Sequence, residues 1–161
     1  MFAREVAVYR AFLATPGIAP VLESIFQYTT DIRLLELSRM DHQLLKELAI
    51  KAPGTYHHSL IIGTLAEAAA ESISANPLLA RVGAYYHDIG KMKMPQYFVE
   101  NSVEDRHGKL TASMSALVIT SHVKEGVEMA KKHRLGQAIT DIISQHHGTA
   151  LVAFFYQKAR N

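Results

Sequence analysis

The sequence contains no cysteine, so disulfide bonds and thiolate metal sites are excluded, and any bound metal must use His, Asp, Glu or water. It has no run of about 18 or more apolar residues, so no segment is predicted to span a bilayer. Its N-terminus lacks the charged-then-apolar pattern of a signal peptide. The formal net charge is only +2 and no block of lysine and arginine dominates, so binding to DNA or RNA is not predicted.

The 161 residues suffice for one domain with a sizeable core, and 48% hydrophobic and 20% charged residues are ordinary for a globular protein. Apolar residues recur at helical spacing almost throughout, and no segment alternates as a strand would, so the predicted fold class is all-α. We predict an N-terminal helical extension over 1–19 and a helical domain over 20–161. The predicted helices cover 2–14, 20–28, two short pieces within 34–48, 55–74, 77–88, 111–133, 136–147 and 151–159, and 92–110 form a long loop.

Local signals predict several helix ends. Asn76 is a predicted N-cap before Pro77, and Thr111 is the predicted N-cap of the helix that runs to His133. Gly90 and Gly148 are predicted to end two helices in the left-handed conformation. In the helix over 55–74, the three- and four-residue spacing predicts a buried stripe that consists of His58, Ile61, Ile62, Leu65, Ala69 and Ile73.

The adjacent pair His87-Asp88 is the main indication of chemistry. An imidazole nitrogen and a carboxylate from neighbouring positions can hold a transition metal, and the second carboxylate oxygen can bridge to another ion. Further candidate ligands precede and follow the pair, at His58, His122, His146 and His147. Six ligands are more than one metal ion with an open catalytic position needs. They suit two metal ions that share one carboxylate as a bridging ligand. The pattern therefore points to a two-metal hydrolytic site.

Each of these residues has a simpler explanation when it is taken alone. A histidine on an apolar face is more often a hydrogen-bonded core residue, and one at a helix end suits the helix dipole. A metal site explains them all together, which favours the metal. Four histidines fit solvated or helix-end positions better than a metal site: His42, His57, His107 and His133. His107 could also approach a substrate. His57 lies about 100° around the helix from His58, so the helix register decides against it as a ligand.

The order of these histidines resembles that of the HD-domain metal-dependent phosphohydrolases. Within this family, the chain is similar to the cytoplasmic HD domain of seven-transmembrane-HD receptors, a group to which the PgpH-type cyclic di-AMP phosphodiesterases belong. The resemblance covers roughly residues 20–160. The segments that carry it are Thr30–Leu37, Ala52–Ser59, Ala84–Lys91, Ile119–Val123 and Gln145–Thr149.

The resemblance implies an HD-domain helical bundle that holds two divalent transition metals, iron or manganese in the first place and zinc as a third option. It implies that Asp88 bridges the metals and that the ligands are His58, His87, Asp88, His122, His146 and His147. The family pattern also has a later aspartate, and residues 148–161 contain no acid, so the domain is expected to be truncated at its C-terminus. The resemblance further implies a cytoplasmic domain of a membrane-anchored protein.

The predicted substrate is a phosphodiester, in the first place a cyclic dinucleotide such as cyclic di-AMP, opened to a linear dinucleotide. Two metals lower the pKa of a bridging water and so supply hydroxide near neutral pH. Lys91 is a candidate to hold a phosphate oxygen. Tyr85, Tyr86, Tyr97 and Phe98 could stack on a base, although packing is their simpler role. Two alternatives stay open, a phosphohydrolase acting on nucleotide monoesters and a non-catalytic domain that senses a nucleotide.

Overall fold

The computed structural model describes residues 29–102 and 106–160, and all regular structure in these ranges is helical. This confirms the predicted all-α class. The helices expected at 2–14 and 20–28, and with them the extension over 1–19, lie outside the described residues. The elements are α2 Asp31–Leu37, α3 Gln43–Lys51, α4 Pro53–Ser72, α5 Pro77–Tyr86, the 3-10 turns η1 Ile89–Lys93, η2 Pro95–Tyr97 and η3 His107–Lys109, then α6 Ala112–Lys132, α7 Gln137–Gln145 and α8 Ala153–Arg160.

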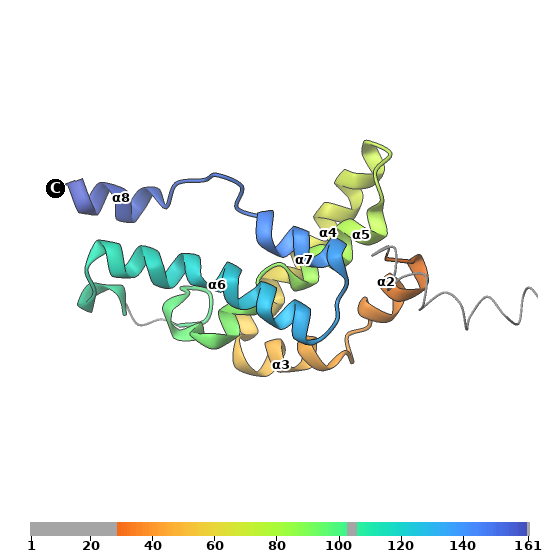
Figure 1. Ribbon diagram of the computed structural model, residues 1–161, viewed down its shortest axis with the longest axis horizontal. Coiled ribbons are helices and arrows are strands. Elements are labelled where there is room, and N and C mark those ends of the chain that lie inside the picture. The colour runs from red at the N-terminus through yellow and green to blue at the C-terminus, as the bar shows by residue number, and fades with distance from the viewer. Residues whose placement is uncertain (1–28, 103–105, 161) are drawn as a thin grey trace, which may run out of the picture.

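The long helices α4 and α5 form an antiparallel hairpin, and α6 and α7 pack beside it, with α3 underneath (Figure 1). An extended segment leads from α7 to α8, which lies alongside the N-terminal half of α6. The core lies where α2, α3, α5, α6 and α7 meet, and its fully buried side chains include Leu37, Leu45, Leu48, Tyr86, Ile139 and Ile143. The Tyr86 hydroxyl is satisfied there, because it donates to the Leu37 carbonyl oxygen at 2.8 Å. None of the described helices is both long enough and apolar enough to cross a bilayer.

Most of the predicted helix ends are confirmed. The Asn76 side chain accepts a hydrogen bond from the Leu79 amide at the start of α5, and Thr111 accepts one from Met114 at the start of α6. These bonds satisfy amides that have no partner inside a helix. Gly148 has φ +53° just after α7, so the predicted left-handed stop is correct at this position.

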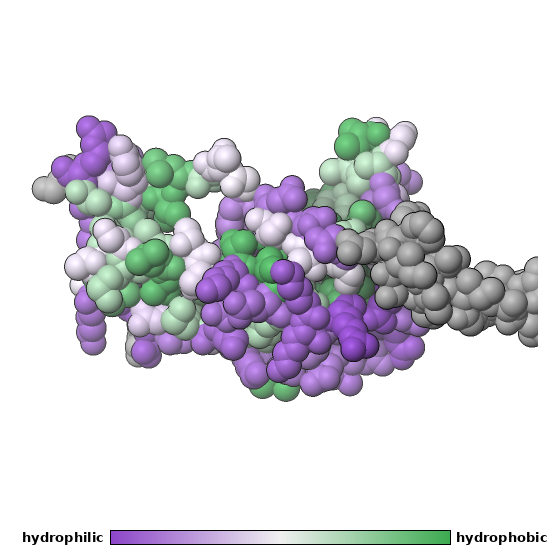
Figure 2. All heavy atoms as spheres, in the orientation of Figure 1, coloured by the Kyte–Doolittle hydropathy of each residue, from purple (hydrophilic) through white to green (hydrophobic). Residues whose placement is uncertain are grey.

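The predicted buried stripe on α4 is wrong, because the structure buries a different face. Ile61 is 49% exposed, Leu65 61% and Ile73 76%, and apolar residues reach the surface at the tip of the α4–α5 hairpin (Figure 2). The buried face consists of the small residues Thr55, Ser59, Gly63 and Ala70. Small side chains let α5 approach closely. A Cβ on Gly63 would lie only 2.4 Å from the Tyr85 ring of α5. Close packing of the hairpin therefore decides the register, and the large apolar residues point outward.

Gly90 does not end a helix in the left-handed conformation, as predicted, but lies buried in η1. Its role is a close approach to α6. A Cβ on Gly90 would lie 1.9 Å from the His122 carbonyl oxygen and 2.6 Å from the Gly126 amide nitrogen. Both are backbone atoms of a long helix, so neither can move aside cheaply. This contact fixes η1, and with it Asp88, against the turn of α6 that carries His122.

Replacing Gly90 by Ala is expected to destabilise the fold by about 3 kcal/mol or more, because the added methyl group would overlap the α6 backbone. Gly148→Ala is the matched control. Its Cβ would meet nothing within 4 Å, and only the left-handed φ would cost about 1 kcal/mol. Thermal unfolding of the two variants measures the difference. Equal losses of stability would contradict the close-approach role of Gly90.

Candidate metal centre

Four separate elements bring the six predicted ligands to one place. α4 carries His58, the α5–η1 junction carries His87 and Asp88, α6 carries His122, and the end of α7 carries His146 and His147. Their ligand atoms form two groups, in each of which all atoms lie within 4.8 Å of one another. One group contains Asp88, His122, His146 and His147, and the other contains His58, His87 and Asp88. Asp88 belongs to both groups, so its carboxylate is placed to be shared between two ions.

The two oxygens of Asp88 have different surroundings. Oδ2 accepts a hydrogen bond from the Lys91 ammonium at 2.9 Å and lies 3.0 Å from Nε2 of His87. Oδ1 lies 3.3 Å from Nε2 of His122 and 3.5 Å from Nε2 of His146, and it has no hydrogen-bond partner among the described residues. Burial acts to raise the pKa of this carboxyl, but the surrounding imidazoles outweigh it and hold the pKa well below its usual range. Asp88 is therefore an anion that needs cations.

Backbone carbonyls orient three of the imidazoles. Nδ1 of His87 lies 2.6 Å from the Ala84 carbonyl oxygen, and Nδ1 of His146 lies 2.8 Å from the Ile143 carbonyl oxygen. Nδ1 of His122 makes the same contact with Ile119, also three residues earlier. A carbonyl only accepts, so Nδ1 carries the proton in each ring. Nε2 is then the nitrogen available to a metal, and the hydrogen bond fixes both the tautomer and the ring direction.

The resulting arrangement fits a metal ion better than it fits the protein groups alone. Nε2 of His122 lies 3.2 Å from Nε2 of His146 and 3.2 Å from Nε2 of His147. Because the backbone bonds place the protons of His122 and His146 on Nδ1, these Nε2 atoms face one another as lone pairs, beside the unpaired Oδ1 of Asp88. Neutral imidazoles and a carboxylate are the donors that borderline transition metals take. A cation at this point would satisfy the three imidazoles and the Asp88 carboxylate together.

The rings at the edge of the centre differ in their exposure. His147 and His58 are exposed, whereas Asp88 and His122 are buried. Burial, and then the neighbouring His146 and His122, lower the pKa of His147, which favours the neutral form that can bind a metal. In His87, burial acts to lower the pKa, but Asp88 outweighs it and the pKa is raised overall. The centre is thus anchored in the core at one end and open to solvent at the other.

Lys91 also lies at the centre, and its surroundings add residues that the sequence did not indicate. Its ammonium donates to Asp88 and to Oε1 of Glu100 at 2.7 Å, and it lies 4.9 Å from the centre of the Phe98 ring. Burial acts to lower its pKa, but the Asp88 charge outweighs it and raises the pKa. Glu100 accepts in turn from the Thr55 hydroxyl at 3.0 Å, and Asn101 bonds both the amide and the hydroxyl of Thr55.

This hydrogen-bond network ties the loop after η2 to the first turn of α4, one turn before His58. It was missed because Glu100 and Asn101 lie in a polar loop without periodicity. Their contacts with Thr55 join residues 45 and 46 positions apart, and only the fold brings these together.

The structure leaves the other histidines outside the two groups. His57 is exposed on α4, and His133 caps the end of α6, as predicted. His42 was expected to be solvated, but it is partly buried, its ring lies 5.6 Å from that of Tyr86, and burial lowers its pKa. Tyr86 packs in the core rather than at a binding surface. His107 lines a cavity and lies 2.8 Å from the Tyr97 carbonyl oxygen.

A model of the HD domain family matches residues 55–159, so the chain belongs to this family, as its histidine pattern predicted. It is 49% identical over 154 residues to the cyclic di-AMP phosphodiesterase PgpH of Listeria monocytogenes and 47% identical over 146 residues to that of Bacillus subtilis. These alignments cover 94% and 89% of this chain, but only 21% and 20% of those proteins. The chain therefore spans about a fifth of the length of these relatives.

Other similarities concern a more distant relative and two crystal structures. Ribonuclease Y of Mycoplasmoides gallisepticum is 31% identical over 104 residues, which is 65% of this chain and 16% of that protein. The crystal structure of the L. monocytogenes PgpH HD domain matches with a TM-score of 0.72 and 52% identity, over 74% of this chain and 59% of that one. The structure of that domain in complex with cyclic di-AMP matches with a TM-score of 0.73 and 50% identity, over 76% and 58%. The HD fold is thereby confirmed.

The neighbouring histidines His57 and His58 allow a test of the smaller ligand group. His58→Ala is expected to lower the Mn²⁺ content per chain, because it removes one of three ligand atoms from the group that contains His87 and Asp88. His57→Ala should leave the metal content unchanged, since His57 belongs to neither group. Metal analysis after gel filtration measures both. Loss of metal in His57→Ala alone would contradict this assignment.

Proposed function

We propose that the chain is the catalytic domain of a metal-dependent phosphodiesterase that opens a cyclic dinucleotide, cyclic di-AMP in the first place, to a linear dinucleotide. The observation that carries this proposal is the pair of ligand groups that share the buried carboxylate of Asp88. Two ions held a few ångströms apart are typical of enzymes that cleave phosphate esters. We propose as metal ligands all six residues of the two groups, His58, His87, Asp88, His122, His146 and His147.

Each residue has a defined part in this proposal. Asp88 supplies one oxygen to each group, and the backbone-bonded imidazoles keep their Nε2 atoms directed at the centre without further reorganisation. Bound divalent transition metals supply the chemistry that lowers the pKa of a water molecule to near neutrality and offsets charge on a phosphate. A histidine-rich donor set suits borderline transition metals. The family resemblance favours iron or manganese among them, with zinc as the third option.

Lys91 is proposed to bind a phosphate oxygen of the substrate. An ammonium has three N–H donors, and Asp88 and Glu100 take two of them, which leaves a third for a phosphate. Asp88 and Glu100 also hold the side chain in a fixed position beside the metal ligands. Because Lys91 is largely buried, its charge acts on the phosphate with little screening by water.

The similar proteins support a phosphodiester as substrate rather than a monoester. PgpH is named as a cyclic di-AMP phosphodiesterase, and a ribonuclease, which shares part of the domain, also acts on phosphodiester bonds. The solved complex of a PgpH HD domain contains cyclic di-AMP. The convergence of all six candidate ligands supports catalysis over nucleotide sensing alone.

We also propose that the chain is a cytoplasmic domain of a membrane-anchored protein, as in the seven-transmembrane-HD receptors that the sequence resembles. The chain spans about a fifth of the length of its PgpH relatives, which supports a larger parent protein.

The proposal is tested by incubating the purified protein, loaded with Mn²⁺ or Fe²⁺ without oxygen, with cyclic di-AMP, cyclic di-GMP and AMP. We expect a linear dinucleotide from cyclic di-AMP and no phosphate from AMP, as measured by liquid chromatography. Asp88→Ala should abolish turnover and metal binding, because both groups lose their common carboxylate. Asp141→Ala, an exposed acid on α7, is the control and should retain both. Metal binding without turnover of any nucleotide would favour the sensing function.

Lys91→Met should lower kcat/KM for the cyclic dinucleotide by about tenfold to hundredfold, because a charged hydrogen bond to the phosphate is lost. Lys93→Met, two residues along the same turn, is the matched control. Its ammonium is exposed and lies 3.8 Å from Glu125, away from the centre, so the rate should be unchanged. Steady-state kinetics decide between them, and equal effects would argue against a direct contact of Lys91 with the substrate.

A further inference from the structure

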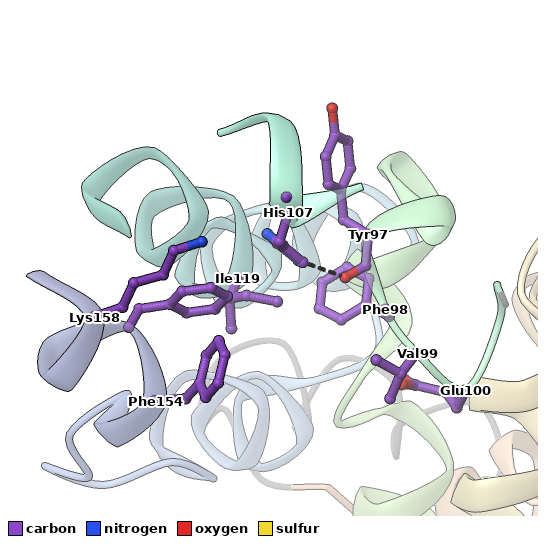
Figure 3. Close-up of a pocket in the computed structure, with 10 residues that line it drawn as sticks. Tyr97, Phe98, Val99, Glu100, His107, Ile119, Phe154 and Lys158 are labelled. Carbon is purple, nitrogen blue, oxygen red and sulfur yellow. Dashed lines mark hydrogen bonds between the residues drawn. The ribbon is translucent and has the colours of Figure 1, made fainter. Parts of the chain in front are cut away.

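Glu100 lies in the loop after η2, between a cavity on one side and α4 on the other. The cavity is largely apolar, has a volume of about 440 Å³ and is lined on one side by Phe98, Val99 and Glu100 (Figure 3). The neighbouring Val99 is 89% exposed, so packing does not hold this part of the loop in place. The position of the Glu100 side chain therefore depends on its contacts with α4 and with Lys91.

The first turn of α4 holds this loop through a close backbone contact and a helix cap. A Cβ on Gly54 would overlap the Glu100 carbonyl oxygen, so the loop lies against α4 with no room for a side chain between them. Ala52, at the N-cap position of α4, makes no side-chain bond to the helix. Asn101 supplies the cap from the loop instead, because its Oδ1 accepts from the Thr55 amide at 3.1 Å.

The cap also fixes the direction of a hydrogen-bond chain. The Thr55 amide only donates, so the carbonyl oxygen of the Asn101 side chain faces it, and the Asn101 amide nitrogen donates to the Thr55 hydroxyl at 2.8 Å. The single hydroxyl proton of Thr55 is then donated to Oε1 of Glu100 at 3.0 Å. The same Oε1 accepts from the Lys91 ammonium at 2.7 Å. The chain of bonds therefore runs from the start of α4 to the lysine beside the metal ligands.

Lys91 needs more than one acceptor to keep a fixed direction. An ammonium on a flexible four-carbon stem has three N–H donors that rotate, so a single acceptor does not orient them. Oδ2 of Asp88 at 2.9 Å and Oε1 of Glu100 at 2.7 Å together take two of the donors, which gives the third a defined direction. Burial acts to raise the pKa of Glu100, but the hydrogen bond from Lys91 outweighs it and the pKa is lowered overall, so Glu100 is a carboxylate.

We propose that Glu100 and Asn101 are positioning residues that act on the substrate only through the ammonium of Lys91. The inference rests on the proposed function, in which Lys91 binds a phosphate oxygen. Glu100 directs the third N–H bond of Lys91 by accepting one of the others, and Asn101 holds the Glu100 oxygen in place through the Thr55 hydroxyl. Glu100 acts through its acceptor oxygen and not through its charge, because a negative charge beside the site repels a phosphate.

Binding of inorganic phosphate to the Mn²⁺-loaded protein tests this inference without turnover. The Kd is obtained from the broadening of the ³¹P resonance by bound Mn²⁺, with variants compared at equal bound Mn²⁺. We expect Glu100→Ala to raise Kd about fivefold and Glu100→Gln to change it by less than about twofold, because glutamine keeps the acceptor oxygen. Lys91→Met should raise Kd at least as much as Glu100→Ala. In the Lys91→Met background, neither change at Glu100 should raise Kd further.

Glu125→Ala is the matched control, because it removes the acid that pairs with Lys93 away from the centre, and it should leave Kd unchanged in both backgrounds. A rise in Kd that Glu100→Ala still causes in the Lys91→Met background would show that Glu100 supports the fold and not Lys91. That result would overturn the inference. An equal loss in Glu100→Gln and Glu100→Ala would overturn it as well, since the charge and not the acceptor oxygen would then be responsible.

Asn101→Asp separates the helix cap from the hydrogen-bond chain. An aspartate still accepts from the Thr55 amide, so the thermal unfolding temperature should be retained. It cannot donate to the Thr55 hydroxyl, whose proton then has a second acceptor besides Glu100. We expect the Kd for phosphate to rise as it does in Glu100→Ala, and only where Lys91 is present. An unchanged Kd would contradict the role of Asn101.

The values of kcat/KM for cyclic di-AMP in the same variants separate this inference from the proposed function. If cyclic di-AMP is cleaved and the losses in Glu100→Ala and Lys91→Met simply multiply in the double variant, the positioning role is refuted and the proposed function stands. If phosphate binding shows the expected dependence on Lys91 but no cyclic dinucleotide is cleaved, the positioning role stands and the proposed function is refuted.

Discussion

The buried carboxylate of Asp88 is the constraint on which the rest of the site depends. Removing an anion from water is costly unless cations or donors surround it, and here the Lys91 ammonium does so on one side only. One carboxylate oxygen is satisfied by the protein, whereas the other faces nitrogen lone pairs and has no partner among the described residues. The fold thus brings several electron-pair donors together in a partly buried site, which is what a binuclear metal site requires.

Close backbone contact keeps this arrangement together. η1 carries Asp88 and α6 carries His122, and the two elements touch at Gly90 with no room for a side chain. Gly126 continues the contact on α6, where a Cβ would lie 2.8 Å from the Ile143 side chain of α7. The same α7 ends in His146 and His147. The positions of ligands from three elements are therefore set by glycine contacts one turn away from them.

Sequence patterns predicted the parts of this structure that depend on local chemistry. The caps at Asn76 and Thr111 and the left-handed Gly148 follow from hydrogen bonding within a few residues, and the structure confirms them. The six candidate ligands could be named because the order of the histidines around His87-Asp88 resembles that of the HD-domain family, which the family model matches. The buried face of α4 could not be predicted from apolar periodicity, because small residues there allow α5 to approach. Glu100 was missed because its contacts with Lys91 and Thr55 arise only from the fold.

The convergence of His122, His146 and His147 also makes the stability of the fold depend on the concentration of free metal. Nε2 of His122 lies 3.2 Å from Nε2 of His146 and from Nε2 of His147 only when α6 and α7 are packed, so an unfolded chain offers no comparable site. A cation that binds the folded form alone adds to stability in proportion to the logarithm of its free concentration, about 1.4 kcal/mol for each tenfold rise above the dissociation constant. The abundance of the folded domain would then follow the supply of metal, independently of any nucleotide.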